Sequence, residues 1–173
     1  YGEEKRRGFY LRDGGYYFAV NDHIDLRITG DIYSKGSYGG TIATNYNKRY
    51  SYNGSLRFNY NKSKLGDFEN PSVSNDFSLS WSHTPDSRGK SSRFSSSVNF
   101  QTNSYNQNKN LVYSNFNESI NAQFNSNISY SKTFNGPFNL SANLRHSQNV
   151  QTKKVNLTLP DVSYNMSRIY PFK

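Results

Sequence analysis

The sequence of 173 residues lacks cysteine and contains only one tryptophan, one methionine and five prolines. The absence of cysteine excludes disulfides, thiol chemistry and cysteine-based metal sites within this sequence. No apolar run approaches the ~20 residues of a membrane-spanning helix, and no apolar segment near the start has the pattern of a signal peptide. Because the first residue is Tyr1 rather than methionine, we expect a processed chain or a piece of a longer one.

Hydrophobic residues are also scarce. They make up 33% of the sequence and the mean hydropathy is −0.92, whereas soluble globular domains contain ~45–50% apolar residues. Such a composition by itself indicates disorder. The chain is nevertheless 16% aromatic, with 15 tyrosines and 12 phenylalanines, which is atypical of disordered chains. The combination favours a β-sheet with one apolar face and one wet face.

The charge balance is basic. Lysine and arginine number 21 against 12 aspartates and glutamates, a net charge of +9, and the pI is about 9.6. Basic chains often bind nucleic acid or anionic lipid. Here the cations are scattered along the sequence rather than clustered, so we expect no nucleic-acid partner. Anionic outer-membrane lipid or glycolipid phosphate is the expected partner if the chain lies in a membrane.

Residues 24–32 show the strongest local pattern, a strict alternation of apolar and polar side chains. The even-numbered members are Ile24, Leu26, Ile28, Gly30 and Ile32. The odd-numbered members are Asp25, Arg27, Thr29 and Asp31. Because successive side chains of a β-strand point to opposite faces, this segment predicts a strand with one aliphatic face and one charged face.

The same alternation recurs through the rest of the chain, without apolar residues at helical spacing. The apolar members are Tyr38, Ile42 and Tyr46; Tyr52, Leu56, Phe58 and Tyr60; Phe77, Leu79, Trp81 and His83; Phe94, Val98 and Phe100; Ile120, Ala122, Phe124, Ile128, Tyr130 and Phe134; Phe138, Leu140, Ala142 and Leu144; and Val155, Leu157 and Leu159. We expect even-numbered residues to face lipid through most strands, with the parity slipping at bulges and changing after Pro160.

Strand length and aromatic spacing indicate a membrane sheet. The pattern predicts about eight or nine strands of roughly 9–13 residues, and membrane strands need ~9–11 whereas soluble strands average ~5–6. Tyr38 and Tyr46 bracket one strand, as Tyr52 and Tyr60 bracket the next. Eight residues at ~3.3 Å and ~40° of tilt span about 20 Å, close to the ~25 Å between aromatic girdles. The predicted fold is all-β: residues 1–173 form a single antiparallel transmembrane β-barrel segment, part of a larger barrel.

Turn-forming residues separate the predicted strands. They lie at 21–22, 35–37, 47–49, 85–90 and 135–137. Two longer connections are expected near 63–75 and 105–117, at one end of the sheet. Longer loops usually face the cell exterior, yet a first strand over Gly8–Val20 rising from the periplasm would put them in the periplasm. A tight turn at Gly14 and Gly15 would reverse this, and the sequence leaves both orientations open.

Nothing in the sequence has the pattern of a catalytic, cofactor or metal site. His23, His83 and His146 are far apart and lack metal-ligand spacing, so we expect structural roles for them, with His83 near a membrane interface. There is no G-x-S-x-G elbow and no phosphate-binding glycine-rich loop. We therefore expect no enzyme activity and no cofactor.

The candidate functional surface lies on the polar side of the predicted strands. Its members are Asp25, Arg27, Asp31 and Arg57, which we expect to face the lumen. The two aspartates flank Arg27 on one face, which favours a lumen charge network over a catalytic pair. Lumen arginines can bind sugar phosphates, although a solvated pore wall is the simpler role for any single one.

Several segments together resemble the LptD (OstA) family of LPS-assembly proteins, in its Bacteroidetes branch. The segments are Gly8-Phe-Tyr-Leu-Arg-Asp-Gly-Gly-Tyr-Tyr-Phe-Ala-Val-Asn-Asp22, Asp25-Leu-Arg-Ile-Thr-Gly-Asp-Ile-Tyr33, Trp81-Ser-His83, Ile128-Ser-Tyr-Ser-Lys-Thr133, His146-Ser-Gln-Asn149 and Arg168-Ile-Tyr-Pro-Phe-Lys173. Each is short, and their order along nearly the whole chain carries the resemblance.

The resemblance implies a large barrel in the outer membrane of a Gram-negative bacterium, preceded by a periplasmic β-jellyroll. In better-known members the lipoprotein LptE plugs the barrel. The family receives lipopolysaccharide from a periplasmic Lpt bridge and inserts it into the outer leaflet, with lipid A leaving between the first and last strands. This chain would then be the N-terminal part of the barrel.

One feature departs from the family. Better-known members carry a proline in each of the first two strands, which weakens pairing near the lateral gate. The matching positions here hold Gly14, Gly15 and Gly30. Glycine also weakens a strand, because it adds backbone entropy and offers no packing side chain. We hypothesise that these glycines loosen the gate strands, and an ordinary bulge or turn is the alternative.

The sequence thus predicts a barrel that transports and inserts lipopolysaccharide without making or breaking bonds. A general outer-membrane pore or receptor barrel shares every physical feature above, and only the resemblance separates the two. A surface-exposed structural β-sheet protein is a third interpretation.

Overall fold

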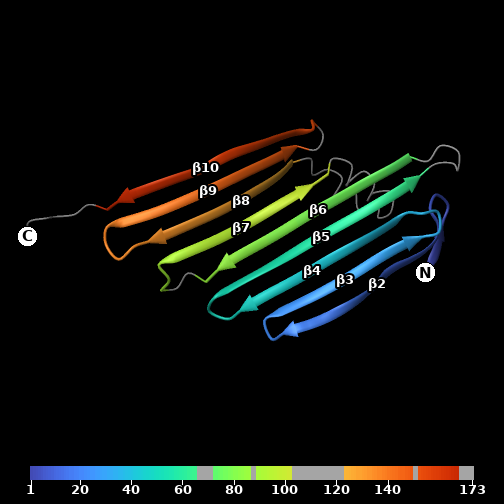
Figure 1. Cartoon of the computed structure of the whole chain (residues 1–173), viewed down its shortest axis with the longest axis horizontal. Helices are drawn as coiled ribbons and strands as arrows, with labels where there is room; N and C mark the ends of the chain where they lie inside the picture. The colour runs from blue at the N-terminus through green and yellow to red at the C-terminus, as the bar shows by residue number, and fades with distance from the viewer. Residues whose placement is uncertain (66–71, 87–88, 103–122, 150–151, 168–173) are drawn as a thin grey trace, which may run out of the picture.

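The computed structural model describes residues 1–65, 72–86, 89–102, 123–149 and 152–167. They form one antiparallel sheet whose ten strands follow one another in chain order, from β1 at one edge to β10 at the other (Figure 1). The strands are β1 (Gly2–Glu4), β2 (Gly8–Asn21), β3 (Ile24–Tyr33), β4 (Tyr38–Lys48), β5 (Tyr52–Leu65), β6 (Ser72–Pro85), β7 (Ser92–Gln101), β8 (Gln123–Thr133), β9 (Phe138–Asn149) and β10 (Lys154–Met166).

The all-β prediction is confirmed, and the strands are long. From β2 onward they contain 10 to 14 residues, which is the length that membrane strands need. The sequence did not predict the three-residue strand β1, which pairs with the start of β2. The sheet is open, with β1 and β10 unpaired to each other. Among the described residues, no helix has the length and apolar character needed to cross a bilayer.

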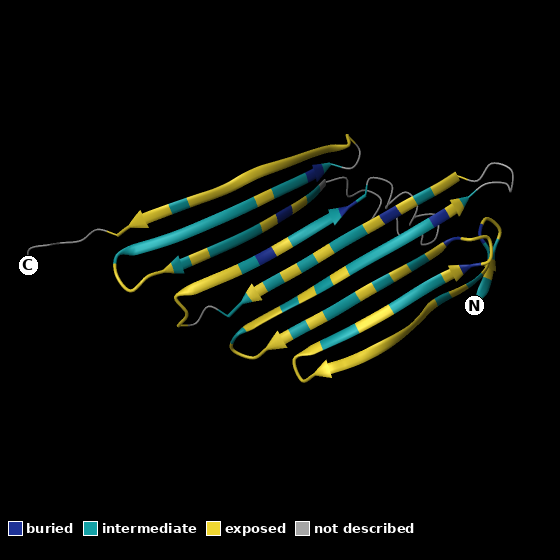
Figure 2. Cartoon of the chain, viewed as in Figure 1, coloured by how far each residue is buried: buried dark blue, intermediate teal, exposed yellow. Residues whose placement is uncertain are grey.

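Strand register confirms that the predicted apolar side chains share a face, which we call the apolar face. The clearest transverse row runs through Ile28, Ile42, Phe58, Leu79 and Phe100. This face carries no covering layer, because Ile28 and Ile42 are each 42% exposed and Tyr33 is the one buried hydrophobic residue among those described. Figure 2 shows exposed residues alternating with less exposed ones along β4 and β6, whereas β10 is exposed along almost its whole length. A soluble sheet would bury such a face against a second layer.

The opposite side, which we call the polar face, carries hydrogen-bonded rows of short polar side chains. One row runs through Thr29, Thr41, Asn59, Ser78 and Gln101. Within it Thr41 Oγ1 donates to Asn59 Oδ1 at 2.8 Å, and Asn59 Nδ2 donates to Ser78 Oγ at 2.9 Å. Cross-strand pairs of this kind stabilise a sheet from a face that contacts water.

The predicted parity change at Pro160 is also confirmed. Before it, Val155 and Leu157 pair with Gln148 and His146, whereas beyond it Tyr164 pairs with Leu140. The register shifts between Thr158 and Asp161, so odd-numbered residues before the shift and even-numbered residues after it share the apolar face. A β-bulge has this effect because it adds an unpaired residue to one strand.

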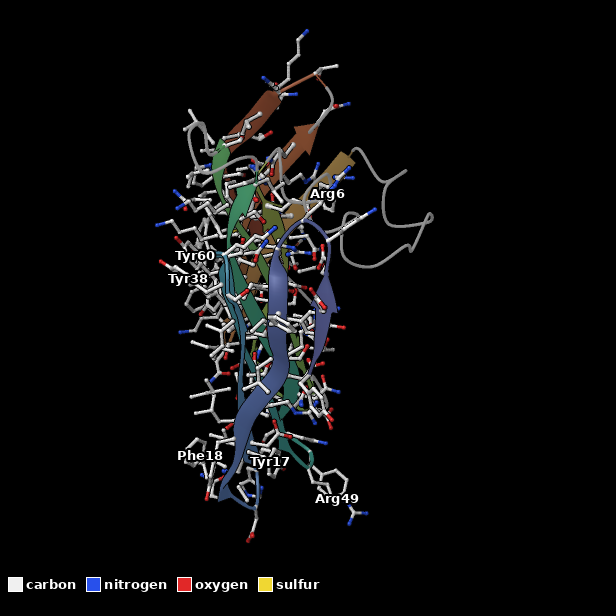
Figure 3. All side chains as sticks on the ribbon, turned by 90° about the vertical axis from the view of Figure 1, so that its right-hand side faces the viewer. Arg6, Tyr17, Phe18, Tyr38, Arg49 and Tyr60 are labelled. Carbon is white, nitrogen blue, oxygen red and sulfur yellow. The ribbon has the colours of Figure 1, made fainter. Side chains whose placement is uncertain are left out.

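Aromatic side chains gather near both ends of the apolar face. At one end the rings of Tyr38 and Tyr60 lie 6.3 Å apart, and Figure 3 shows both projecting from the same side of the sheet. At the other end Tyr46 lies 6.0 Å from Tyr52 and accepts a 2.9 Å hydrogen bond from Trp81 Nε1. Two aromatic bands with an aliphatic zone between them are typical of a sheet that spans a bilayer.

The connections differ from the prediction in two respects. Gly14 and Gly15 lie within the continuous strand β2, so they do not form a tight turn. The first long connection is shorter than 63–75, because β5 extends to Leu65 and β6 begins at Ser72. The polar residues there continue the ladder, with Ser63 paired to Ser74.

The second predicted connection, at 105–117, lies outside the described residues, as do Ile120, Ala122 and the closing 168–173 segment. The strands bordering both connections end at the same end of the sheet, as predicted (Figure 1).

Both edges of the sheet present unpaired strands. Beyond Tyr10 the strand β2 pairs only with β3, since β1 reaches no further along it. Its Tyr16 and Phe18 are 69% and 44% exposed, and Leu157 on β10 is 63% exposed. Long apolar edges of this kind promote aggregation unless another strand pairs with them.

Substitutions on the two faces test the assignment of lipid to the apolar face. In phospholipid vesicles, Ile42→Arg is expected to lower the free energy of unfolding by roughly 2–4 kcal/mol, because it places a charge in the apolar zone. The adjacent Thr41→Arg is expected to cost about 1 kcal/mol, the lost hydrogen bond to Asn59. Urea unfolding followed by the heat-modifiable gel shift measures both. Equal losses for the two variants would contradict the assignment.

Candidate functional site

Two arginines occupy one transverse row of the polar face. Arg27 on β3 pairs with Ala43 on β4, which pairs with Arg57 on β5. Both arginine side chains are exposed, and neither makes a hydrogen bond or ion pair with another described residue. Two strand spacings separate their backbones by roughly 10 Å, and the small Ala43 leaves the space between them open. The row therefore presents two uncompensated guanidinium groups on the wet side.

The predicted charge network of Asp25, Arg27 and Asp31 is wrong for the described residues. Asp25 Oδ1 instead accepts hydrogen bonds from the backbone N–H of Asn45 at 2.9 Å and from Asn45 Nδ2 at 3.1 Å. Asp31 Oδ1 accepts one from the backbone N–H of Asp13 at 2.8 Å. Both carboxylates thus bind backbone amides of the adjacent strands β4 and β2, and among the described residues neither forms an ion pair with Arg27 on their own strand.

Asp13 lies at an irregularity in the pairing of β2 with β3. From the sequence, a bulge or turn was expected at the glycines that follow it. Its φ angle is 56°, in the left-handed region that aspartate tolerates better than most residues. The pairing of β2 with β3 shifts between Leu11 and Gly14 around it. The hydrogen bond that Asp13 N donates to Asp31 Oδ1 holds this bulge, so the irregularity of the edge strand lies one residue before its glycine pair.

The predicted gate glycines have different surroundings. Gly14 pairs with Gly30, and Gly30 pairs with Gly40, so three glycines lie side by side on β2, β3 and β4. A Cβ added at any of the three would meet no atom closer than 3.5 Å. At Gly15 an added Cβ would overlap the carbonyl oxygen of Ile28. Gly15 is therefore required by the close approach of β2 to β3, whereas the other three leave a shallow gap in the apolar face.

The start of the chain contains a charged cluster that the sequence analysis missed. Glu4 Oε1 accepts a hydrogen bond from Arg7 Nε at 3.2 Å, and Glu4 Oε2 accepts one from Arg12 Nη2 at 3.1 Å. Arg7 lies over the Tyr33 ring with its Cζ 4.4 Å from the centroid, and Arg12 lies 4.0 Å from the Tyr10 centroid. Arg12 Nε also donates to Tyr33 Oη at 2.9 Å. The cluster fastens β1 and the start of β2 to the end of β3.

Hydrogen bonds between the start of β2 and the turn after β3 hold the same region. Ser34 donates its backbone N–H to the Phe9 carbonyl at 2.8 Å, and Phe9 N donates to Ser34 Oγ at 3.0 Å. The Arg7 side chain is 2% exposed, which is rare for an arginine unless it is paired. No sequence motif indicates this cluster, because its members come together only when β1 folds back along β2.

Two of the three histidines contact aromatic rings. His83 lies on the apolar face, where its Nδ1 is 3.0 Å from Tyr46 Oη and its ring is 5.8 Å from that of Tyr52. His146 contacts the Phe100 ring at 5.8 Å. Within the part of the chain that the structure describes, no three histidine, aspartate or glutamate side chains gather as metal ligands would.

Comparison with known protein families identifies the family of this chain. The family described as LptD protein matches residues 1–173, the whole chain. This confirms the family expected from the ordered sequence segments. No curated protein and no solved structure matches the chain.

Removal of the Glu4 carboxylate tests the charged cluster. Glu4→Gln is expected to lower stability by roughly 1–3 kcal/mol, because the buried Arg7 guanidinium loses its anionic partner. Trypsin should then cleave faster in the turn at Lys5 and Arg6, as followed by mass spectrometry. Glu3→Gln is the matched control, since Glu3 is exposed and makes no ion pair among the described residues. Equal cleavage rates in both variants would show that the cluster does not hold β1.

Proposed function

The chain belongs to the LptD protein family, and from this membership we propose that it transports lipopolysaccharide and inserts it into the outer leaflet. The family acts in lipopolysaccharide transport at the outer membrane, and it is a transport and assembly family rather than an enzyme family. The observation that carries the finer proposal is the two-sided sheet. An apolar face without a covering layer suits lipid, and a continuous polar face suits a wet passage.

The open edges support a place within a larger barrel. In the hydrocarbon region of a bilayer an unpaired backbone group costs several kcal/mol, so only closed sheets span it. The exposed edges of β2 and β10 therefore require further strands of the complete protein. In this proposal residues 1–173 form one arc of the barrel wall, with the polar face turned to the lumen.

The polar face offers groups that suit an anionic glycolipid. Asp25 and Asp31 are occupied by backbone hydrogen bonds, so Arg27 and Arg57 are left as uncompensated cations in the lumen. Guanidinium groups bind phosphate oxygens in bidentate fashion. We assign to this pair the role of attracting phosphate groups of lipopolysaccharide as it passes. A plug lipoprotein like LptE and a periplasmic bridge are the partners that the proposal implies.

The glycine row is proposed as the gate element. Gly14, Gly30 and Gly40 give β2, β3 and β4 no side chains to pack across their shared row. Glycine in a strand lowers its stability relative to residues with packing side chains. Weakened packing along this row, next to the free edge of β2, would let the first strands bend away from the last strand of the complete barrel. Lipid could then leave the lumen laterally into the membrane. Gly15 is assigned a steric role instead.

Depletion tests the transport proposal. Cells with a repressible copy of the gene are expected to lose surface lipopolysaccharide, measured by labelling of intact cells, while total lipopolysaccharide is retained. A porin without a role in lipopolysaccharide transport, depleted in the same way, serves as the control for general membrane damage. Unchanged surface lipopolysaccharide after depletion would refute transport and favour the pore or receptor interpretation.

Valine substitutions test the gate. Gly30→Val is expected to lower surface delivery several-fold, because a β-branched side chain fits its site and strengthens pairing of β2 with β3 and of β3 with β4. Ser96→Val is the matched control, a β-branched substitution on the apolar face of β7, outside the glycine row. Delivery is measured by complementation of the depleted strain. The gate role is refuted by normal delivery with Gly30→Val, or by equal loss in both variants.

A further inference from the structure

A hollow of about 450 Å³ lies on the polar face over β7, β8, β9 and β10, on other strands than Arg27 and Arg57. Its polar-face lining consists of Ser97, Asn125, Asn127, Arg145, Ser147 and Thr158. The volume falls within the ~300–1,000 Å³ of small-molecule sites. Its lining side chains carry hydroxyl, amide and guanidinium groups that can hydrogen-bond a polar ligand.

Strand register explains why the hollow forms. Ser97, Asn127, Arg145 and Thr158 succeed one another across the four strands in a single row. Short side chains on both sides of the one long side chain leave open space around the guanidinium group. Thr158 is also the last residue of β10 before its register shift, and such bulges often border binding sites.

Arg145 is the charged residue of this lining. It is exposed and makes no hydrogen bond or ion pair with any other residue in the described part of the chain. The nearest carboxylate in register, Asp161, lies beyond the bulge opposite Asn143. An arginine without a carboxylate partner presents its planar fork of donors to an incoming anion.

We propose that this hollow binds a phosphorylated sugar, with Arg145 holding the phosphate group and the two asparagines binding ring hydroxyls. Asparagine amides both donate and accept hydrogen bonds, as sugar hydroxyls do. Asn125 and Asn127 are two residues apart on β8 and therefore share a face, and Ser147 pairs with Asn125. The assignment rests on the proposed function, since a passing glycolipid would supply such a group to the lumen.

The test uses the purified protein in detergent micelles and N-acetylglucosamine 6-phosphate as the probe, with binding measured by saturation-transfer NMR. Arg145→Gln is expected to weaken binding at least about tenfold through loss of a charge-assisted hydrogen bond. Arg93→Gln is the matched control, because Arg93 is an exposed arginine on the same face of β7 outside the hollow. Arg93→Gln should bind the probe like the parent protein.

Two further probes define the ligand class. Neutral N-acetylglucosamine and inorganic phosphate should each bind markedly more weakly than the phosphorylated sugar. Equal binding of inorganic phosphate would show a simple anion site and overturn the sugar assignment, and equal binding of the neutral sugar would overturn the role of Arg145. Equal losses in the Arg145 and Arg93 variants would show a diffuse charge effect and overturn the hollow as a site.

Asn127→Trp provides a second variant that keeps the charge and fills the hollow. It should abolish binding while the heat-modifiable gel shift reports a folded sheet, and retained binding would refute the proposal even if Arg145→Gln does not fold. The binding measurement does not depend on export. If the probe does not bind but depletion still lowers surface lipopolysaccharide, only this site is refuted. If the probe binds but depletion leaves surface lipopolysaccharide unchanged, only the transport role is refuted.

Discussion

Backbone hydrogen bonding between neighbouring antiparallel strands organises every other feature of this sheet. Nine consecutive strand pairs hold the chain as a single layer, and no second layer among the described residues covers its apolar face. Antiparallel pairing with side-chain period two then divides every strand between two environments. A chain of such low hydropathy can therefore form an ordered sheet, because only alternate residues need an apolar neighbour.

The polar face shows how charge is distributed once the ladder is in place. Its aspartates are short and lie beside exposed backbone amides, so Asp25 and Asp31 stabilise the sheet locally. Its arginines are long and reach past their neighbours, so Arg57 and Arg145 extend into the solvent-filled side. The excess of cations in the sequence therefore appears as exposed arginines on this face, although no single segment of the sequence is strongly basic.

The irregular features concentrate at the two edges of the sheet. At the first edge the Asp13 bulge, the glycine row and the Glu4 cluster modify how β1, β2 and β3 pair. At the last edge β10 shifts register near Pro160. Bulges and weak rows disturb the ladder least where a strand has only one partner, so a barrel that opens sideways would be expected to carry them at an edge.

Side-chain alternation and ordered motifs are local properties, so the strand class, the two faces and the family could be predicted from the sequence alone. The sequence pointed to Gly14 and Gly30 as separate gate candidates. It did not show that Gly40 lies in the same row, since register depends on how strands pair across the sheet. It also missed the Glu4 cluster and the Arg145 hollow, and it assigned Asp25 and Asp31 to an ionic network that is not formed. Each of these features joins residues that only pairing between strands brings together. They can therefore be identified only when the register of the folded sheet is known.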